Sequence, residues 1–197
     1  MHAGVGASYQ YMLTVAHCTA WADNQSIYNG AGAYMGYSDY VAELITANYD
    51  LALIRLGAGK TGAGKIYLTP PGDNGFTNKT VAGYAASGIM TGAEYCVSAR
   101  KLSPRCGVFA GSQSVFCTAL CTYVIDVYNN NYNIFCHGDS GGPVYYYITG
   151  YPNSVIAAGL VKGIYTNNGA QCSNFGAISG VSTAIDTVGQ GLTITLG

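Results

Sequence analysis

Short apolar runs, bounded by Gly, Asn and Pro, recur along the whole chain. In YDLALIRL (49–56), apolar residues nearly alternate with smaller or charged ones, which predicts a half-buried strand. Four further runs rich in β-branched and aromatic residues predict strands: YMLTVAH (11–17), TYVIDVY (122–128), PVYYYITG (143–150) and SVIAAGLVKGIYT (154–166). Only Ser182–Val188 has the spacing of a helical turn or two. We therefore expect an all-β barrel or sandwich.

The composition narrows the class of protein. The 197 residues suffice for one domain or for two small barrels that share a core. Charged residues make up 9%, the net charge is −1, and the eight Lys and Arg are scattered, so the chain lacks the basic surface that nucleic acids require. Uncharged stretches of membrane-spanning length occur at 106–125, 140–161 and 163–185, but Gly, Ser and Thr interrupt each one. We expect neither a nucleic-acid partner nor a membrane span.

Seven cysteines indicate an oxidising compartment. They are Cys18, Cys96, Cys106, Cys117, Cys121, Cys136 and Cys172, and none belongs to the paired CxxC motifs that hold structural zinc. A disulfide framework fits this pattern and leaves one cysteine without an internal partner. The first ten residues do not read as a signal peptide, so we expect a secreted, extracellular protein whose leader has been removed.

The loop GAGKTGAGK (57–65) nearly spells a phosphate-binding motif. Gly59, Gly64 and Lys65 have the required spacing, but the motif also needs Ser or Thr after the Lys and a helix behind it. Here IYL (66–68) follows, which predicts a strand. We interpret the segment as a surface loop and expect no nucleotide and no other cofactor.

Three residues could together perform nucleophilic catalysis. A serine hydroxyl needs an imidazole to take its proton, and the imidazole needs a carboxylate to orient it. Ser140 lies in the glycine-rich GDSGGP, His17 ends the apolar run LTVAHC, and Asp50 opens the strand YDLALIRL. The glycines around Ser140 let the amides of Gly138 and Ser140 point at one spot, as a developing oxyanion requires. Taken alone, a histidine such as His17 is more often structural than catalytic, and an aspartate such as Asp50 is more often a turn residue.

The segments TVAHC, YDLALIRL and CHGDSGGPV, in this order, resemble the signature segments of the chymotrypsin-like (trypsin-like) serine peptidases. The resemblance runs from about Gly6 to the C-terminus. Three finer features are similar to the bacterial streptogrisin-like branch: Cys96 followed by Cys106-Gly107, GLVKG before Cys172, and GQGLTITL at the end.

This resemblance implies a fold of two antiparallel six-stranded β-barrels. Residues 1–80 would form the N-terminal barrel, which carries His17 and Asp50, and residues 81–197 the C-terminal barrel, which carries Ser140 and the specificity pocket. It implies His17 as general base, Asp50 as its orienting carboxylate and Ser140 as nucleophile, with the Gly138 and Ser140 amides as the oxyanion hole.

The resemblance also implies the surroundings of the substrate. Cys136 would pair with Cys172 beside the pocket and Cys96 with Cys106, which leaves Cys117 and Cys121 to each other. Ile134 would form the pocket floor, or Asn133 or Phe135 if the loop shifts by one. An apolar floor disfavours Lys and Arg and favours an apolar or aromatic residue before the scissile bond. The remaining substrate-binding candidates are His137, which could instead be a solvated rim residue, Lys162 and Gly163.

The chain departs from the family pattern at three places. No cysteine precedes Cys18, so Cys18 is the expected odd thiol and the first strand of the N-terminal barrel is expected to be missing. Lys162 stands where the family has a serine that donates to the catalytic carboxylate. Asp139 would need an internal arginine, with Arg100 and Arg105 as candidates.

We expect a monomeric, secreted serine endopeptidase that acts on polypeptides, with activity rising at about pH 6–7 as His17 loses its proton. The alternative is a non-catalytic binding protein on the same fold. An esterase of the α/β-hydrolase fold is disfavoured because His17 precedes Ser140 in the chain.

Overall fold

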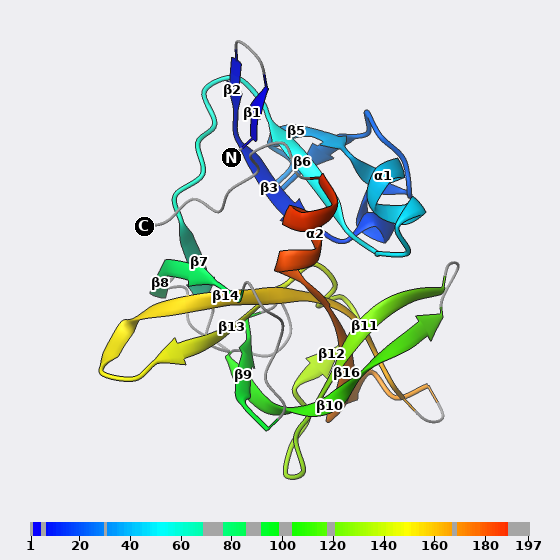
Figure 1. The fold of residues 1–197 in the computed structure, drawn as a ribbon, viewed down its shortest axis with the longest axis vertical. Helices are drawn as coiled ribbons and strands as arrows, with labels where there is room; N and C mark the ends of the chain where they lie inside the picture. Colours follow the sequence, from blue (N-terminus) through cyan, green and yellow to red (C-terminus); the bar gives the residue numbers. More distant parts are fainter. Residues whose placement is uncertain are drawn as a thin grey trace.

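The computed structural model describes residues 2–4, 7–29, 31–68, 77–85, 92–98, 104–117, 121–166 and 169–188. The chain forms two strand-rich halves, with the short helix α2 (Val181–Val188) between them (Figure 1). The all-β architecture predicted from the sequence is confirmed, and each of the five predicted strands overlaps an observed strand.

The N-terminal half is built on a four-stranded antiparallel sheet. Its order is β3 (Tyr11–Thr14), β6 (Ala52–Leu56), β5 (Tyr34–Asp39) and β4 (Ser26–Tyr28). A separate hairpin, β1 (His2–Gly4) with β2 (Ala7–Tyr9), precedes β3. Within the described residues these strands do not close into a barrel, which agrees with the expectation of an incomplete N-terminal barrel.

Strand β6 is buried on both faces, so the prediction that this strand is half-buried is wrong. Ala52, Leu53 and Ile54 are all 3% exposed or less. One face packs Ala52 against Ala16 and the short helix α1 (Val41–Thr46), while the other packs Leu53 against α2. The cause is tertiary, because helices cover the two sides of this central strand.

The C-terminal half is a closed barrel of six antiparallel strands. Its order is β13 (Pro143–Ile148), β9 (Glu94–Val97), β10 (Arg105–Cys117), β11 (Cys121–Tyr128), β16 (Phe175–Gly180) and β14 (Tyr151–Ile164), and β14 pairs back onto β13. Closure leaves no free edge along these six strands. Buried Tyr, Val, Ile and Phe side chains fill the interior.

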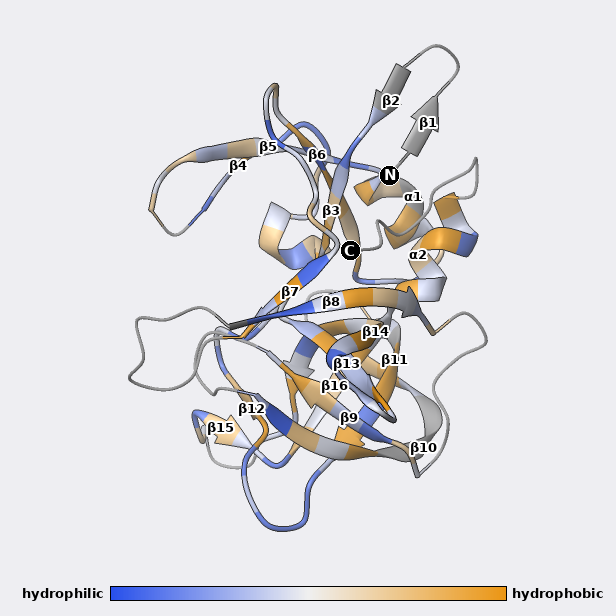
Figure 2. Cartoon of the chain, turned by 90° about the vertical axis from the view of Figure 1, so that its left-hand side faces the viewer, coloured by the Kyte–Doolittle hydropathy of each residue, from blue (hydrophilic) through white to orange (hydrophobic). Residues whose placement is uncertain are grey.

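Two more strands extend this sheet rather than the N-terminal one. β7 (Lys65–Leu68) pairs with β8 (Thr77–Tyr84), and β8 runs parallel to β14 (Figure 2). The strand expected at 66–68 is confirmed. Thr80, where we expect the first barrel to end, lies within β8, and the division of the chain at this residue stays a prediction.

The two halves share one apolar cluster around α2, the helix expected near Ser182–Val188. Its buried members come from both ends of the chain: Val15, Leu44, Leu51, Leu53, Leu160, Ala184 and Val188. The helix thus connects the base of β3 and β6 to β14 of the closed barrel. No described helix is long and apolar enough to cross a membrane.

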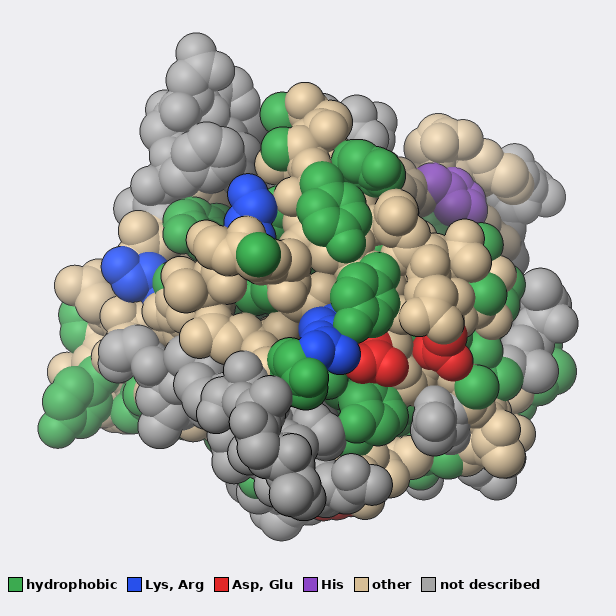
Figure 3. All heavy atoms as spheres, turned by 90° about the horizontal axis from the view of Figure 1, so that it is seen from above, with side chains coloured by type: hydrophobic (Ala, Val, Ile, Leu, Met, Phe, Trp, Pro, Cys, Tyr) green, Lys and Arg blue, Asp and Glu red, His purple; other side chains and the backbone are tan. Residues whose placement is uncertain are grey.

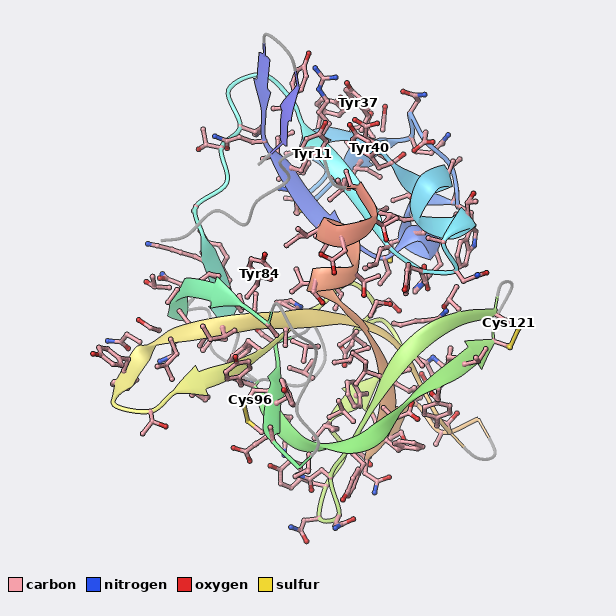
Figure 4. The ribbon with its side chains drawn as sticks, in the orientation of Figure 1. Tyr11, Tyr37, Tyr40, Tyr84, Cys96 and Cys121 are labelled. Atoms are coloured by element: carbon pink, nitrogen blue, oxygen red, sulfur yellow. A yellow bond between two sulfur atoms is a disulfide. The ribbon has the colours of Figure 1, made fainter. Side chains whose placement is uncertain are left out.

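Three disulfides join cysteines of the C-terminal half: Cys96–Cys106, Cys117–Cys121 and Cys136–Cys172. The first and the third are the pairs that the family resemblance implies, and the second is the pair expected by elimination. The first two staple neighbouring strands, at Cys96 on β9 and at Cys121 at the tip of the β10–β11 hairpin (Figure 4). The third joins the two-stranded pair β12 (Phe135–Cys136) and β15 (Cys172–Ser173). Cys18 is a free, exposed thiol.

Candidate active site

His17 lies in a short 3-10 helix, η1 (Ala16–Thr19), that one residue, Val15, separates from β3. Its backbone N–H donates to Asp50 Oδ1 at 3.0 Å, and its ring Nδ1 lies 2.7 Å from Asp50 Oδ2. Because a carboxylate only accepts, Nδ1 carries the proton, and in the neutral imidazole Nε2 keeps its lone pair. The imidazole is therefore in the tautomer that a general base needs.

Asp50 precedes β6 and its side chain is 0% exposed. A carboxylate without access to water needs hydrogen bonds and a neighbouring cation. His17 supplies two hydrogen bonds, and the ammonium of Lys162 lies 3.6 Å from Oδ2. The turn that ends α1 delivers Asp50 to this place, since Tyr49 N–H donates to the Leu44 carbonyl.

The pKa of His17 lies well above its ordinary value. Burial lowers the pKa of His17, but the hydrogen bonds to Asp50 and Cys18 raise it more, to about 9. The sequence-based expectation of about pH 6–7 used the reference pKa. It could not include the contacts of His17 with Asp50 and Cys18, which together account for the difference.

Ser140 lies in a tight loop between β12 and β13. Gly138 and Gly141 have φ of +91° and +79°, which L side chains rarely adopt. The amides at 136, 137, 139, 141 and 142 all donate to protein acceptors. Among the described residues, the amides of Gly138 and Ser140 have no such acceptor. These are the two amides assigned to the oxyanion hole.

The loop that carries Ser140 touches the N-terminal half. A Cβ at Gly141 would come within 2.8 Å of Thr14 Oγ1, so only Gly fits beside the end of β3. The Cys18 thiol lies 4.0 Å from the Ser140 carbonyl oxygen. The structure thus brings His17, Asp50 and Ser140 together at one junction. Ser140 Oγ donates to the Lys162 carbonyl at 3.5 Å, and the described contacts include no Ser140–His17 hydrogen bond.

Lys162 is fully buried, and its ammonium faces three oxygen atoms. Nζ bonds to Thr122 Oγ1, approaches the Phe116 carbonyl at 3.4 Å and pairs with Asp50 at 3.6 Å. Burial lowers the pKa of Lys162, while the charge of Asp50 opposes that effect. The sequence identified Lys162 as unusual, but nothing in it indicated Thr122 or Phe116 as partners.

A cavity of about 540 Å³ lies beside the Cys136–Cys172 disulfide. It is lined by Asn133, Tyr165, Thr166, Ala170, Cys172, Ser173, Asn174 and Phe175, none of them charged. Of the three candidates for the pocket floor, Asn133 lines this cavity, whereas Ile134 and Phe135 are buried in the barrel core. The cavity is therefore uncharged but more polar than the expected apolar floor.

The other substrate-binding candidates differ in exposure. His137 is exposed, and its backbone N–H donates to the Gln171 carbonyl. Gly163 lies under the Phe116 ring, which a Cβ would approach to 2.7 Å. Asp139 is buried, and one of its carboxylate oxygens accepts the Cys136 N–H.

Of the two arginines considered for Asp139, Arg105 lies over the Tyr132 ring and Arg100 lies outside the described residues.

Only one group of three possible metal ligands occurs among the described residues. Glu94, Cys96 and Cys106 place their ligand atoms within 4.8 Å of one another. Both sulfurs belong to a disulfide and so offer no thiolate. On the face in Figure 3, Lys and Arg side chains are few and separated, without a basic stripe.

Solved structures share this fold. Protease A of Thermobifida fusca matches with a TM-score of 0.66 and 19% identity, over 96% of this chain and 87% of that one. A chymotrypsin of Cellulomonas bogoriensis matches with a TM-score of 0.63 and 19% identity, over 94% and 85%. An α-lytic protease homolog, N4, matches with a TM-score of 0.69 and 17% identity, over 98% and 89%. No family model and no curated protein matches the sequence. The chain has the fold of bacterial chymotrypsin-like serine proteases.

Proposed function

We propose that the chain is a secreted serine endopeptidase that hydrolyses peptide bonds through an acyl-enzyme. The observation that carries the proposal is the pair of contacts from His17 to Asp50, at the junction that the Ser140 loop reaches. This fold performs such chemistry with a histidine base, an aspartate that orients it and a serine nucleophile, in that order along the chain. The solved structures that share the fold are named as proteases, which supports the same reaction class.

In the proposed mechanism, Ser140 Oγ attacks the carbonyl carbon of the scissile peptide. His17 takes the hydroxyl proton on Nε2 and then gives it to the leaving amine, while Asp50 holds Nδ1–H and stabilises the imidazolium. Water next attacks the acyl group and gives a proton to His17, which passes it to Ser140 Oγ as the bond between the acyl carbon and Oγ breaks. For the first step the Ser140 hydroxyl must turn from the Lys162 carbonyl toward His17, which is a change of side-chain rotamer.

The amides of Gly138 and Ser140 are proposed to bind the oxyanion. Support comes from the surrounding loop, in which the other amides from 136 to 142 already donate to protein acceptors. Two rigidly held donors stabilise the charge that develops on the carbonyl oxygen. Removing one donor from such a site lowers kcat by about 10²–10³.

The proposed substrates are polypeptides with an uncharged side chain before the scissile bond. The uncharged cavity beside Cys136–Cys172 supports this choice, and its Tyr165 and Phe175 walls suit an apolar or aromatic group. His137, Lys162 and Gly163 remain proposed substrate-binding residues, whereas Asn133 replaces Ile134 as the proposed floor of the pocket, because the Ile134 side chain lies in the barrel core. The three disulfides support export, and we propose a monomer that needs no cofactor, nucleic acid or membrane.

A fluorophosphonate probe, which reacts with activated serines, tests the proposal. The unaltered protein should be labelled and should cleave a denatured protein substrate, and Ser140→Ala should remove both signals. Ser182→Ala, on α2, is the matched control and should keep both. Labelling that survives Ser140→Ala would refute the assignment. Peptide binding by a folded, unlabelled and inactive chain would instead support the non-catalytic binding protein.

A further inference from the structure

The Lys162 side chain ends inside the protein beside the proposed catalytic carboxylate. Both the Lys162 and the Asp50 side chains are 0% exposed. Three oxygens surround the ammonium: Thr122 Oγ1, the Phe116 carbonyl and Asp50 Oδ2. The Phe116 ring also lies 5.5 Å from Nζ. A lysine enclosed by three acceptors is arranged to keep its proton, since each acceptor can take one N–H.

A triad of this kind creates a charge problem in its resting state. His17 must be neutral to act as a base, and Asp50 must be charged to hold Nδ1–H. A buried carboxylate next to a neutral imidazole then has no balancing charge, which is unfavourable. Among the described residues, Lys162 is the cation besides His17 that pairs with Asp50, and both approach the same oxygen, Oδ2.

We propose that Lys162 is a positioning residue that shares Asp50 with His17, so that its ammonium balances the buried carboxylate whenever the imidazole is neutral. The inference rests on the proposed serine-peptidase function. The same residue also accepts the hydrogen bond of Ser140 Oγ through its backbone carbonyl. Lys162 therefore contacts two members of the triad, Asp50 through its side chain and Ser140 through its main chain.

The groups that face the pair fix the direction of the effect. His17 contacts Asp50, Cys18 and the Trp21 ring, and Lys162 contacts Asp50, Thr122 and Phe116. The positive charge of Lys162 weakens the hold of Asp50 on a protonated His17. Removing that charge should therefore raise the pKa of His17. The higher His17 pKa should move the acid limb of the pH profile of kcat/KM to higher pH by the same amount.

The test compares Lys162→Met, which is neutral and similar in length, with Lys162→Arg, which keeps the charge. NMR titration of the His17 ring measures its pKa directly. In Lys162→Met, the ammonium that shares Asp50 with His17 is lost. At an effective dielectric constant near 20, this loss should raise the His17 pKa by about 1 or more. At a pH below the His17 pKa, a pKa higher by about 1 should lower kcat/KM about tenfold, and this part of the loss should shrink as the pH rises above the His17 pKa. Lys162→Arg should keep the His17 pKa within about 0.5 of its value in the unaltered protein.

Lys79→Met is the matched control, because the Lys79 ammonium bonds to the Pro152 carbonyl and not to the site. It should leave the His17 titration unchanged. An unchanged His17 pKa in Lys162→Met would overturn the proposal, as would a rate loss of equal size at every pH. If Lys162→Met does not fold, ¹³C NMR of the lysine side chains in the unaltered protein decides. A neutral Lys162 amine in the pH range where His17 titrates would overturn the proposal.

The two proposals can fail separately. Absence of Ser140 labelling and of peptide hydrolysis would refute the endopeptidase, whereas the His17 titration needs no activity. A change of the His17 pKa in an inactive protein would leave the Lys162 inference standing.

Discussion

Replacing Asp50 by Asn should strongly destabilise the protein, in addition to any effect on catalysis. The substitution keeps the size of the side chain but removes its charge. Asp50 accepts two hydrogen bonds from His17 and pairs with a Lys162 ammonium that is itself 0% exposed. In Asp50→Asn that ammonium remains buried without a counterion. Removing one partner of a buried ion pair costs about 3–5 kcal/mol of unfolding free energy.

Urea unfolding at pH 7 measures the loss of unfolding free energy in Asp50→Asn, in a Ser140→Ala background that prevents self-digestion. Trp21 is the single tryptophan of the chain and its ring centroid lies 6.0 Å from that of His17, so its fluorescence reports on this region. For a chain of 197 residues, a loss of about 3–5 kcal/mol corresponds to a melting temperature lower by roughly 6–20 °C. Asp186→Asn, at an exposed position of α2, is the control and should change stability by less than about 0.5 kcal/mol.

A second substitution identifies the cause. If the unpaired ammonium is responsible, adding Lys162→Met to Asp50→Asn should restore about 1–2 kcal/mol or more, because the double variant buries no charge at this place. Two results would refute the reasoning: a loss below about 1 kcal/mol in Asp50→Asn, or a double variant less stable than Asp50→Asn alone.

Two further predictions concern pH and the disulfide framework. Because the pKa of His17 is raised to about 9, kcat/KM should rise with pH to a plateau above that value, and a midpoint at about pH 6–7 in the pH profile would contradict the raised pKa. Replacing both Cys136 and Cys172 by Ser should lower the unfolding free energy by about 3–4 kcal/mol, since their disulfide closes a loop of 36 residues. Urea unfolding measures that loss, and a change below about 1 kcal/mol would contradict it.

The strands of the barrel and the positions of the catalytic candidates could be predicted because their signals are local. Strand-forming residues between turn residues mark β11, β13 and β14, and the segments around His17, Asp50 and Ser140 are distinctive within a few residues. Helix α1 had no such signal. VAELIT is six residues long and includes Val, Ile and Thr, which favour helix weakly. It forms because Val41 and Leu44 are both 0% exposed, a tertiary effect that no short window contains.

Long-range contacts account for the rest of the differences. β8 joins the C-terminal sheet through a parallel pairing with β14, which lies about 75 residues further along the chain in register from Thr80 to Ser154. Ile134 was a candidate for the pocket floor by its distance from Ser140, yet its side chain lies in the barrel core, against the position where a Cβ of Gly107 would be. Counting along a loop does not determine on which side of the backbone each residue lies.

The raised pKa of His17 and the buried Lys162 have a common origin in how the site is assembled. His17 and Asp50 come from the N-terminal half, whereas Ser140 and Lys162 come from the C-terminal half. The ion pair between Asp50 and Lys162 therefore crosses the junction between the halves, beside the close approach of Gly141 to Thr14 and the α2 cluster. A serine hydroxyl at position 162 could donate to Asp50 but could not balance its charge. With lysine at position 162, the Asp50–Lys162 ion pair supports both the docking of the two halves and a neutral, reactive His17. A substitution that breaks this ion pair should therefore weaken the docking and also raise the pKa of His17.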